Sequence, residues 1–130
     1  MRLLLDTHIA LWTVYRSAKL SPIARSLLAD PTAEVYCGVI SLWEIAIKRE
    51  KYPDQLPDAA TARRDFLQAG IQYWPLHGEV FERLETLPQI HKDPFDRLLV
   101  AMAFAEPIRL VTADAVLAAY DAGGQLILTV

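Results

Sequence analysis

The chain has little of several residue types that define other protein classes. A single cysteine, Cys37, excludes an internal disulfide framework and fits a reducing cytosol. Its position in the apolar run VYCGVI indicates a small core residue rather than a nucleophile. The three histidines, His8, His77 and His91, lie too far apart for a zinc-binding pattern, and we expect each at the surface or in a supporting position.

Other features are missing as well. No apolar run reaches the ~18 residues that span a bilayer, and no small-residue cleavage site follows the first apolar segment, so a cytoplasmic protein is expected. Walker A and G-x-G-x-x-G loops are absent, which leaves nucleotide cofactors without support. The net charge of −3 excludes nucleic-acid binding through bulk positive charge. It leaves a nuclease open, because an acidic metal site supplies negative charge by itself.

What the chain does have is an alternation of predicted strands and helices. Its 130 residues, 53% of them hydrophobic, suit a single domain spanning residues 1–130. Strands are expected at residues 2–5, 34–40, 71–74, 108–112 and 125–130. Helices are expected at residues 9–15, 22–30, 41–48, 59–68, 79–87, 94–105 and 113–120. This order predicts an α/β fold, a three-layer α/β/α domain with a mostly parallel sheet.

The segment DPFDRLLVAMAFA predicts a buried helix with acids at its start. Asp93 suits the N-cap and Pro94 the first helical position, where a missing N–H costs nothing. The residues that follow leave almost no polar face, which is typical of a helix inside a protein. Asp96 is therefore expected at the edge of an apolar core, where the helix dipole favours an acid by about 0.3–1 kcal/mol.

Four acids follow the predicted strands or open the helices beyond them: Asp6, Glu44, Asp96 and Asp114. Ligands bind at the carboxyl ends of the strands in sheets of this kind. Each acid also has a structural explanation, since Asp6 and Asp114 can cap helices and Ser41 with Glu44 matches a capping box. Together, however, four carboxylates at one edge repel each other, and a divalent cation such as Mg²⁺ removes that repulsion.

Four segments in their order and spacing resemble the PIN-domain ribonucleases, closest to VapC-type toxins of bacterial toxin–antitoxin pairs: LLLDTHIALW, SLWEIAIK, HKDPFDRLLVAMA and LVTAD. The resemblance covers nearly the whole chain. It implies hydrolysis of single-stranded RNA with Mg²⁺ or Mn²⁺ held by Asp6, Glu44, Asp96 and Asp114. Asp6 and Asp96 would be the direct ligands, and the other two would complete the site or orient water.

The resemblance also implies contacts and partners. Thr112 matches a hydroxyl position that accompanies the last acid, and we assign it with Arg97 to substrate binding, although a solvated role for Arg97 is equally open; Lys92 has the same two readings. A small antitoxin that crosses the active-site groove is expected as partner, and so is a homodimer or a higher oligomer with the antitoxin.

Three tryptophans, Trp12, Trp43 and Trp74, could supply apolar surface for these partners, but we expect each of them in the core. Two other readings stay open. The chain could be a catalytically silent interaction module that keeps its acids as caps. It could also be a metal-dependent phosphohydrolase, although that reading lacks a second acid two residues after Asp6.

Overall fold

A computed structural model describes all 130 residues and contains five strands and seven helices. The strands are β1 (Arg2–Leu5), β2 (Glu34–Gly38), β3 (Gln72–Trp74), β4 (Arg109–Thr112) and β5 (Ile127–Thr129). The helices are α1 (Thr7–Val14), α2 (Pro22–Ala29), α3 (Val39–Lys51), α4 (Ala59–Gln68), α5 (Glu79–Thr86), α6 (Pro94–Ala105) and α7 (Ala115–Ala118). No helix is both long and apolar enough to cross a bilayer.

The five strands form one sheet in the order β3-β2-β1-β4-β5, and every neighbouring pair is parallel. The chain builds one half of the sheet outward from β1 through β2 and β3. It then returns to place β4 on the other side of β1. The carboxyl ends of β1 and β4 therefore flank the point where the strand order reverses, which is where open α/β sheets bind ligands.

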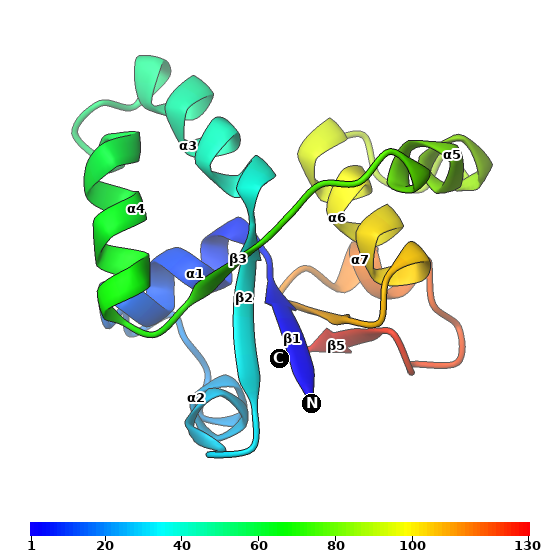
Figure 1. Ribbon diagram of the computed structural model, residues 1–130, viewed down its shortest axis with the longest axis horizontal. Coiled ribbons are helices and arrows are strands. Elements are labelled where there is room, and N and C mark those ends of the chain that lie inside the picture. Colours follow the sequence, from blue (N-terminus) through cyan, green and yellow to red (C-terminus); the bar gives the residue numbers. More distant parts are fainter.

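Helices cover both faces of this sheet (Figure 1), so the predicted three-layer α/β/α architecture is confirmed. Side chains of a strand alternate between faces. Leu3 and Leu5 accordingly join the core beneath α1, α2 and α4, whereas Leu4 joins the core beneath α5, α6 and α7. Helix α3 lies above the carboxyl end of the sheet and contributes Ile45 to the first core and Ile40 to the second.

Helix α6 is buried from Leu98 to Ala103, as its apolar sequence predicts. Asp93 caps it by accepting hydrogen bonds from the backbone N–H groups of Phe95 and Asp96 at 2.8 and 3.2 Å. The capped end faces the carboxyl edge of the sheet beside α3. The buried body of α6 thus fixes where its two acids lie.

The capping box predicted for Ser41 and Glu44 is wrong. Strand β2 ends at Gly38, two residues earlier than expected, and α3 begins at Val39 with Gly38 in the N-cap position. Ser41 therefore lies inside the first turn and is fully buried. A short β-branched run such as Val39-Ile40 reads equally as a strand end or a buried helix start, and only packing against α6 decides.

Cys37 and Trp43 were both predicted to lie in the core. Cys37 is buried in the sheet as expected, and burial raises the pKa of its thiol to about 12, which makes it unreactive. Trp43, expected in the core, is 60% exposed on α3 and contacts the ring of Phe95 edge-to-face at 5.2 Å. The prediction failed because Trp43 lies on the side of α3 that faces away from the sheet core.

Candidate active site

Asp6 directly follows β1 and serves two structural purposes. Its Oδ1 accepts the backbone N–H of Ile9 at 2.8 Å and so caps α1, and its Oδ2 accepts the Thr112 hydroxyl at the end of β4. The side chain is only 5% exposed. Burial raises the pKa of Asp6, although its hydrogen bonds with Thr112 and Ile9 act in the opposite direction.

Glu44 projects from α3 into the same region and is 2% exposed. Its Oε1 accepts the Thr7 hydroxyl at 2.6 Å, and its Oε2 pairs with Lys48 one turn later. Burial acts to lower the pKa of Lys48, but the bond and charge of Glu44 outweigh it and raise that pKa. Sequence reasoning missed Lys48, although its i,i+4 spacing from Glu44 was a usable signal.

Asp96 occupies the first turn of α6 and is the least satisfied acid of the group. No N–H or O–H donor lies within hydrogen-bond distance of its carboxylate, and the closest ion-pair partner is His91 Nε2 at 3.6 Å. Burial, together with the nearby carboxylates of Asp93, Glu44 and Asp6, raises the pKa of Asp96 to about 7. Three separate elements thus bring negative charge to one place, as predicted.

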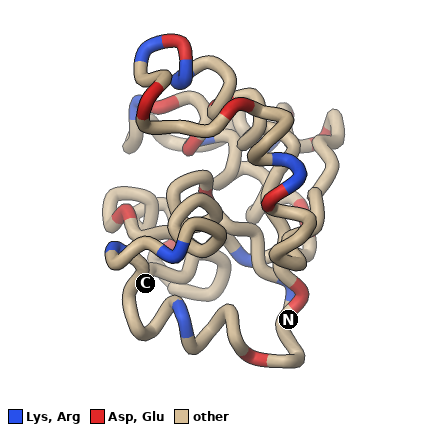
Figure 2. Tube along the Cα trace, turned by 90° about the vertical axis from the view of Figure 1, so that its left-hand side faces the viewer, with Lys and Arg blue, Asp and Glu red and all other residues tan.

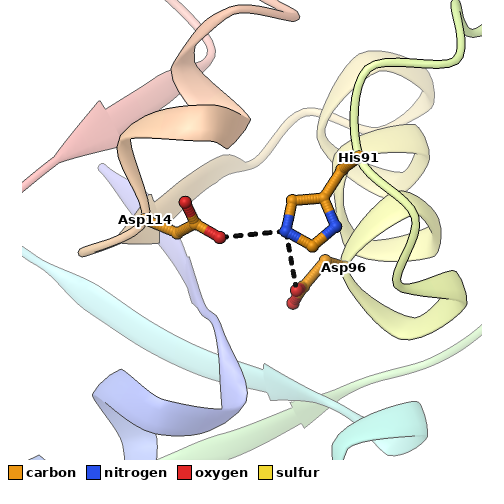
Figure 3. Close-up of side chains that lie close together, drawn as sticks. All are labelled: His91, Asp96 and Asp114. Carbon is orange, nitrogen blue, oxygen red and sulfur yellow. Dashed lines mark hydrogen bonds and ion pairs between the residues drawn. The ribbon is translucent and has the colours of Figure 1, made fainter.

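Asp114 follows β4, and His91 lies between it and Asp96. Asp114 Oδ2 lies 3.0 Å from His91 Nε2, and Asp114 Oδ1 accepts the backbone N–H of Val116 to cap α7. Figure 3 shows the three side chains pointing toward one another from the loop before α6, from α6 itself and from the end of β4. One ligand atom from each of His91, Asp96 and Asp114 lies within 4.8 Å of the others. From the sequence, His91 was expected at the surface or in a supporting position.

The donor set fits a hard divalent cation. The site offers carboxylate oxygens from Asp6, Glu44, Asp96 and Asp114, with no cysteine among them. Hard cations such as Mg²⁺ prefer these oxygens. Asp96 in particular holds two oxygens that the protein leaves without hydrogen-bond donors, and burial with the nearby carboxylates raises its pKa because they disfavour its charged form, which a bound cation would stabilise.

Two residues assigned to substrate binding are engaged within the protein. Thr112 is fully buried, and its hydroxyl donates to Asp6 while accepting the backbone N–H of Asp114 at 3.0 Å. It therefore positions the two acids instead of facing a ligand. Arg97 donates through Nη1 to the backbone carbonyl of Pro88 at 3.0 Å, which holds the loop before α6. Lys92, beside the acids in sequence, is exposed.

A cavity of about 490 Å³ is lined by one of the four acids, Glu44. Lys48 and the loop between α3 and α4 also line it. Its wall carries four aromatic or imidazole side chains, from His8, Trp12, Tyr15 and Tyr52. Elsewhere the charges are mixed, and Figure 2 shows acidic and basic residues interspersed along the side it displays.

A scan of protein families matches residues 3–123, which include all four acids, to the PIN domain. The chain belongs to the PIN domain family. No curated protein matches the chain. Among solved structures, this PIN domain is similar to VapBC2 from Rickettsia felis bound to a DNA fragment from their promoter, with a TM-score of 0.70 and 17% identity over 98% of this chain and 97% of that one. At this identity the likeness shows a shared fold alone.

Proposed function

We propose that this PIN domain is a metal-dependent endoribonuclease that cuts single-stranded RNA and acts as a VapC-type toxin. The observation that carries the proposal is the state of Asp96. Its carboxylate has no donor from the protein and its pKa is raised to about 7 by burial and by the carboxylates of Asp93, Glu44 and Asp6. A fold that needed Asp96 only as a favourable charge in the first turn of α6 would not surround it with like charge.

The residues divide the work of the proposed reaction. Asp6 and Asp96 would hold Mg²⁺ or Mn²⁺ directly, with Glu44 and Asp114 completing the site. A bound cation would help to ionise water and stabilise negative charge on the phosphate. Lys48 keeps Glu44 in place and offsets part of its charge. The exposed Lys92 is free to contact a neighbouring phosphate of the RNA.

The cavity beside Glu44 supports an unpaired strand as the substrate. Proteins that bind single-stranded RNA stack its bases on aromatic side chains and meet its backbone with cations. The cavity combines Trp12, Tyr15 and Tyr52 with Lys19 and Lys48. A strand whose base entered this cavity would have its phosphate near Glu44.

Two protein partners belong to the proposal. The same cavity, with apolar walls from Leu11 and Leu56, suits a segment of a small antitoxin that would block the site. A second copy of the chain would cover the exposed side of α3, where Val39, Trp43 and Ile47 are spaced by one turn and are 43–60% exposed. We expect each subunit of such a homodimer to be a single domain.

Cleavage of unstructured RNA with Mg²⁺, with Mn²⁺ and with chelator tests the activity. Wild type should cut only when a divalent cation is present. Asp96→Asn and Asp6→Asn should each cut more than ~100-fold more slowly, since loss of a ligand should exceed the ~10–100-fold typical of supporting residues. Glu85→Gln, an acid-to-amide change on the exposed surface of α5, is the matched control and should cut like wild type.

Induced expression gives the biological arm of the test. Wild type should arrest growth, and Asp96→Asn should not. Arrest by both proteins, combined with no cleavage of RNA by either, would replace the nuclease with the catalytically silent interaction module. Cleavage by Asp96→Asn at the wild-type rate would remove Asp96 from the metal-binding set.

A further inference from the structure

The ring of His91 is fixed in one tautomer by its surroundings. The backbone N–H of Asp93 donates to His91 Nδ1 at 3.0 Å, so Nδ1 is an acceptor and carries no proton. In a neutral imidazole the proton then sits on Nε2. Nε2 lies 3.0 Å from Asp114 Oδ2, and the hydrogen bond runs from the ring to the carboxylate.

This tautomer keeps His91 out of the metal's ligand shell, although its Nε2 lies close to Asp96 and Asp114. A histidine ligates a metal through an unprotonated nitrogen. Freeing Nε2 for that purpose would move the proton to Nδ1, where it would face the backbone N–H of Asp93. Two donors would then oppose each other, so the loop geometry disfavours a metal bond to His91.

We propose that His91 is a positioning residue, which holds the carboxylate of Asp114 toward Asp96 by donating to it from Nε2. The proposal rests on the proposed function, because it assigns Asp114 to the same cation site. Residues that orient ligating carboxylates are a regular part of metal sites and their loss costs about 10–100-fold in affinity or activity.

The need for a positioning residue follows from where Asp114 lies. Its side chain is 39% exposed, and α7, which it caps, has only four residues. Without His91, only the backbone N–H of Val116 would orient the carboxylate. A second link joins the same two segments, since the backbone N–H of His91 donates to the Tyr120 hydroxyl at 2.8 Å. Two hydrogen bonds thus join the loop before α6 to the segment after β4.

Two substitutions separate the donor at Nε2 from the acceptor at Nδ1. In His91→Asn the short side chain can still accept the Asp93 N–H but cannot reach Asp114. In His91→Gln the amide nitrogen extends about as far as Nε2 and can donate to Asp114. We expect His91→Asn to weaken Mn²⁺ binding and slow cleavage by about 10–100-fold. His91→Gln should recover most of both, and the control His77→Asn, on an exposed histidine paired with Glu106, should change neither.

The partner of His91 is tested by a double-mutant cycle. If His91 acts through Asp114, then His91→Asn should cost little in an Asp114→Ala background, because the bond it removes is already absent. Equal losses in both backgrounds would overturn the proposal. So would an equal defect in His91→Asn and His91→Gln, since that result would assign His91 to the loop alone.

A third measurement needs neither metal nor RNA. Nitrogen-15 spectra of the histidine rings at pH 8 in chelator, where an imidazole is ordinarily neutral, should show the Nε2–H form for His91. The Nδ1–H form would overturn the proposal. Absence of cleavage by wild type would refute the proposed ribonuclease, whereas the ring tautomer and the Mn²⁺ affinities of the variants would still decide the role of His91.

Discussion

The acids of the site fall into two groups that the fold treats differently. The inner acids, Asp6 and Glu44, are 5% and 2% exposed, and every carboxylate oxygen has a partner inside the protein. The outer acids, Asp96 and Asp114, have side chains that are 23% and 39% exposed. Asp96 has no hydrogen-bond donor, and Asp114 depends on His91 and one backbone N–H.

This difference indicates that the fold gives the inner and the outer acids separate structural roles. The inner acids form hydrogen bonds that link β1, α1 and α3, so replacing either acid should also destabilise the fold. The outer acids lie at the start of a buried helix and of a short one, where Asp114 caps α7 and Asp96 accepts no hydrogen bond. Substitutions of inner and of outer acids should therefore differ in their effects on stability and on activity.

The largest contrast is expected between Asp6→Ala and Asp96→Ala in free energy of unfolding. Asp6→Ala removes the cap of α1 and leaves the buried Thr112 hydroxyl without its acceptor. These losses should cost about 2–4 kcal/mol. Asp96→Ala breaks no hydrogen bond and should cost little in chelator. Urea denaturation of both variants measures the contrast, and equal losses would erase the distinction between inner and outer acids.

A divalent cation should stabilise the wild-type fold through the outer acids. Binding to the folded state alone raises the free energy of unfolding by about 2.7 kcal/mol at one hundred times the dissociation constant. Melting curves with chelator and with Mn²⁺ should show this gain in wild type and little of it in Asp96→Asn. Wild type that melts at one temperature in both conditions would contradict the metal site.

The raised pKa of Asp96 predicts how pH changes stability without metal. The folded state binds its proton up to about pH 7, whereas the unfolded state releases it near its ordinary value of ~3.9. This contribution to stability is full below about pH 4 and is lost as pH rises through 7. At pH 8 in chelator, Asp96→Asn should be more stable than wild type by about 1–3 kcal/mol. A less stable Asp96→Asn at pH 8 would show that the charge is favourable there.

The smallest effect is expected from Ser41→Ala. Ser41 is fully buried, but its hydroxyl contacts only the Thr7 hydroxyl, 2.9 Å away, and it caps no helix. Its removal should cost about 0.5–1.5 kcal/mol and leave cleavage nearly unchanged. Glu44→Gln should instead lose most cleavage. If both variants lose the same stability and both keep cleaving, Glu44 belongs to the fold and not to the site.

Much of the fold could be read from the sequence because its signals are local. The capping pair Asp93-Pro94, the apolar body of α6 and the proline that opens α2 each mark an element on their own. Boundaries failed where a run of residues suits two structures, as at Val39 and Ile40. The prediction that Trp43 is buried failed for a similar reason, because the sequence does not tell which side of α3 packs against another element.

The sequence by itself determined the alternation of strands and helices and placed four acids at the ends of those elements. Both follow from periodicity and from capping chemistry, which act over a few residues. Only the tertiary structure decided that Asp96 lacks a hydrogen-bond donor and that His91 contacts Asp114. His91 and Asp114 are 23 positions apart along the chain, and they come into contact only when the sheet and its helices pack. Burial and the interactions between charges depend on such contacts, and local sequence does not determine them.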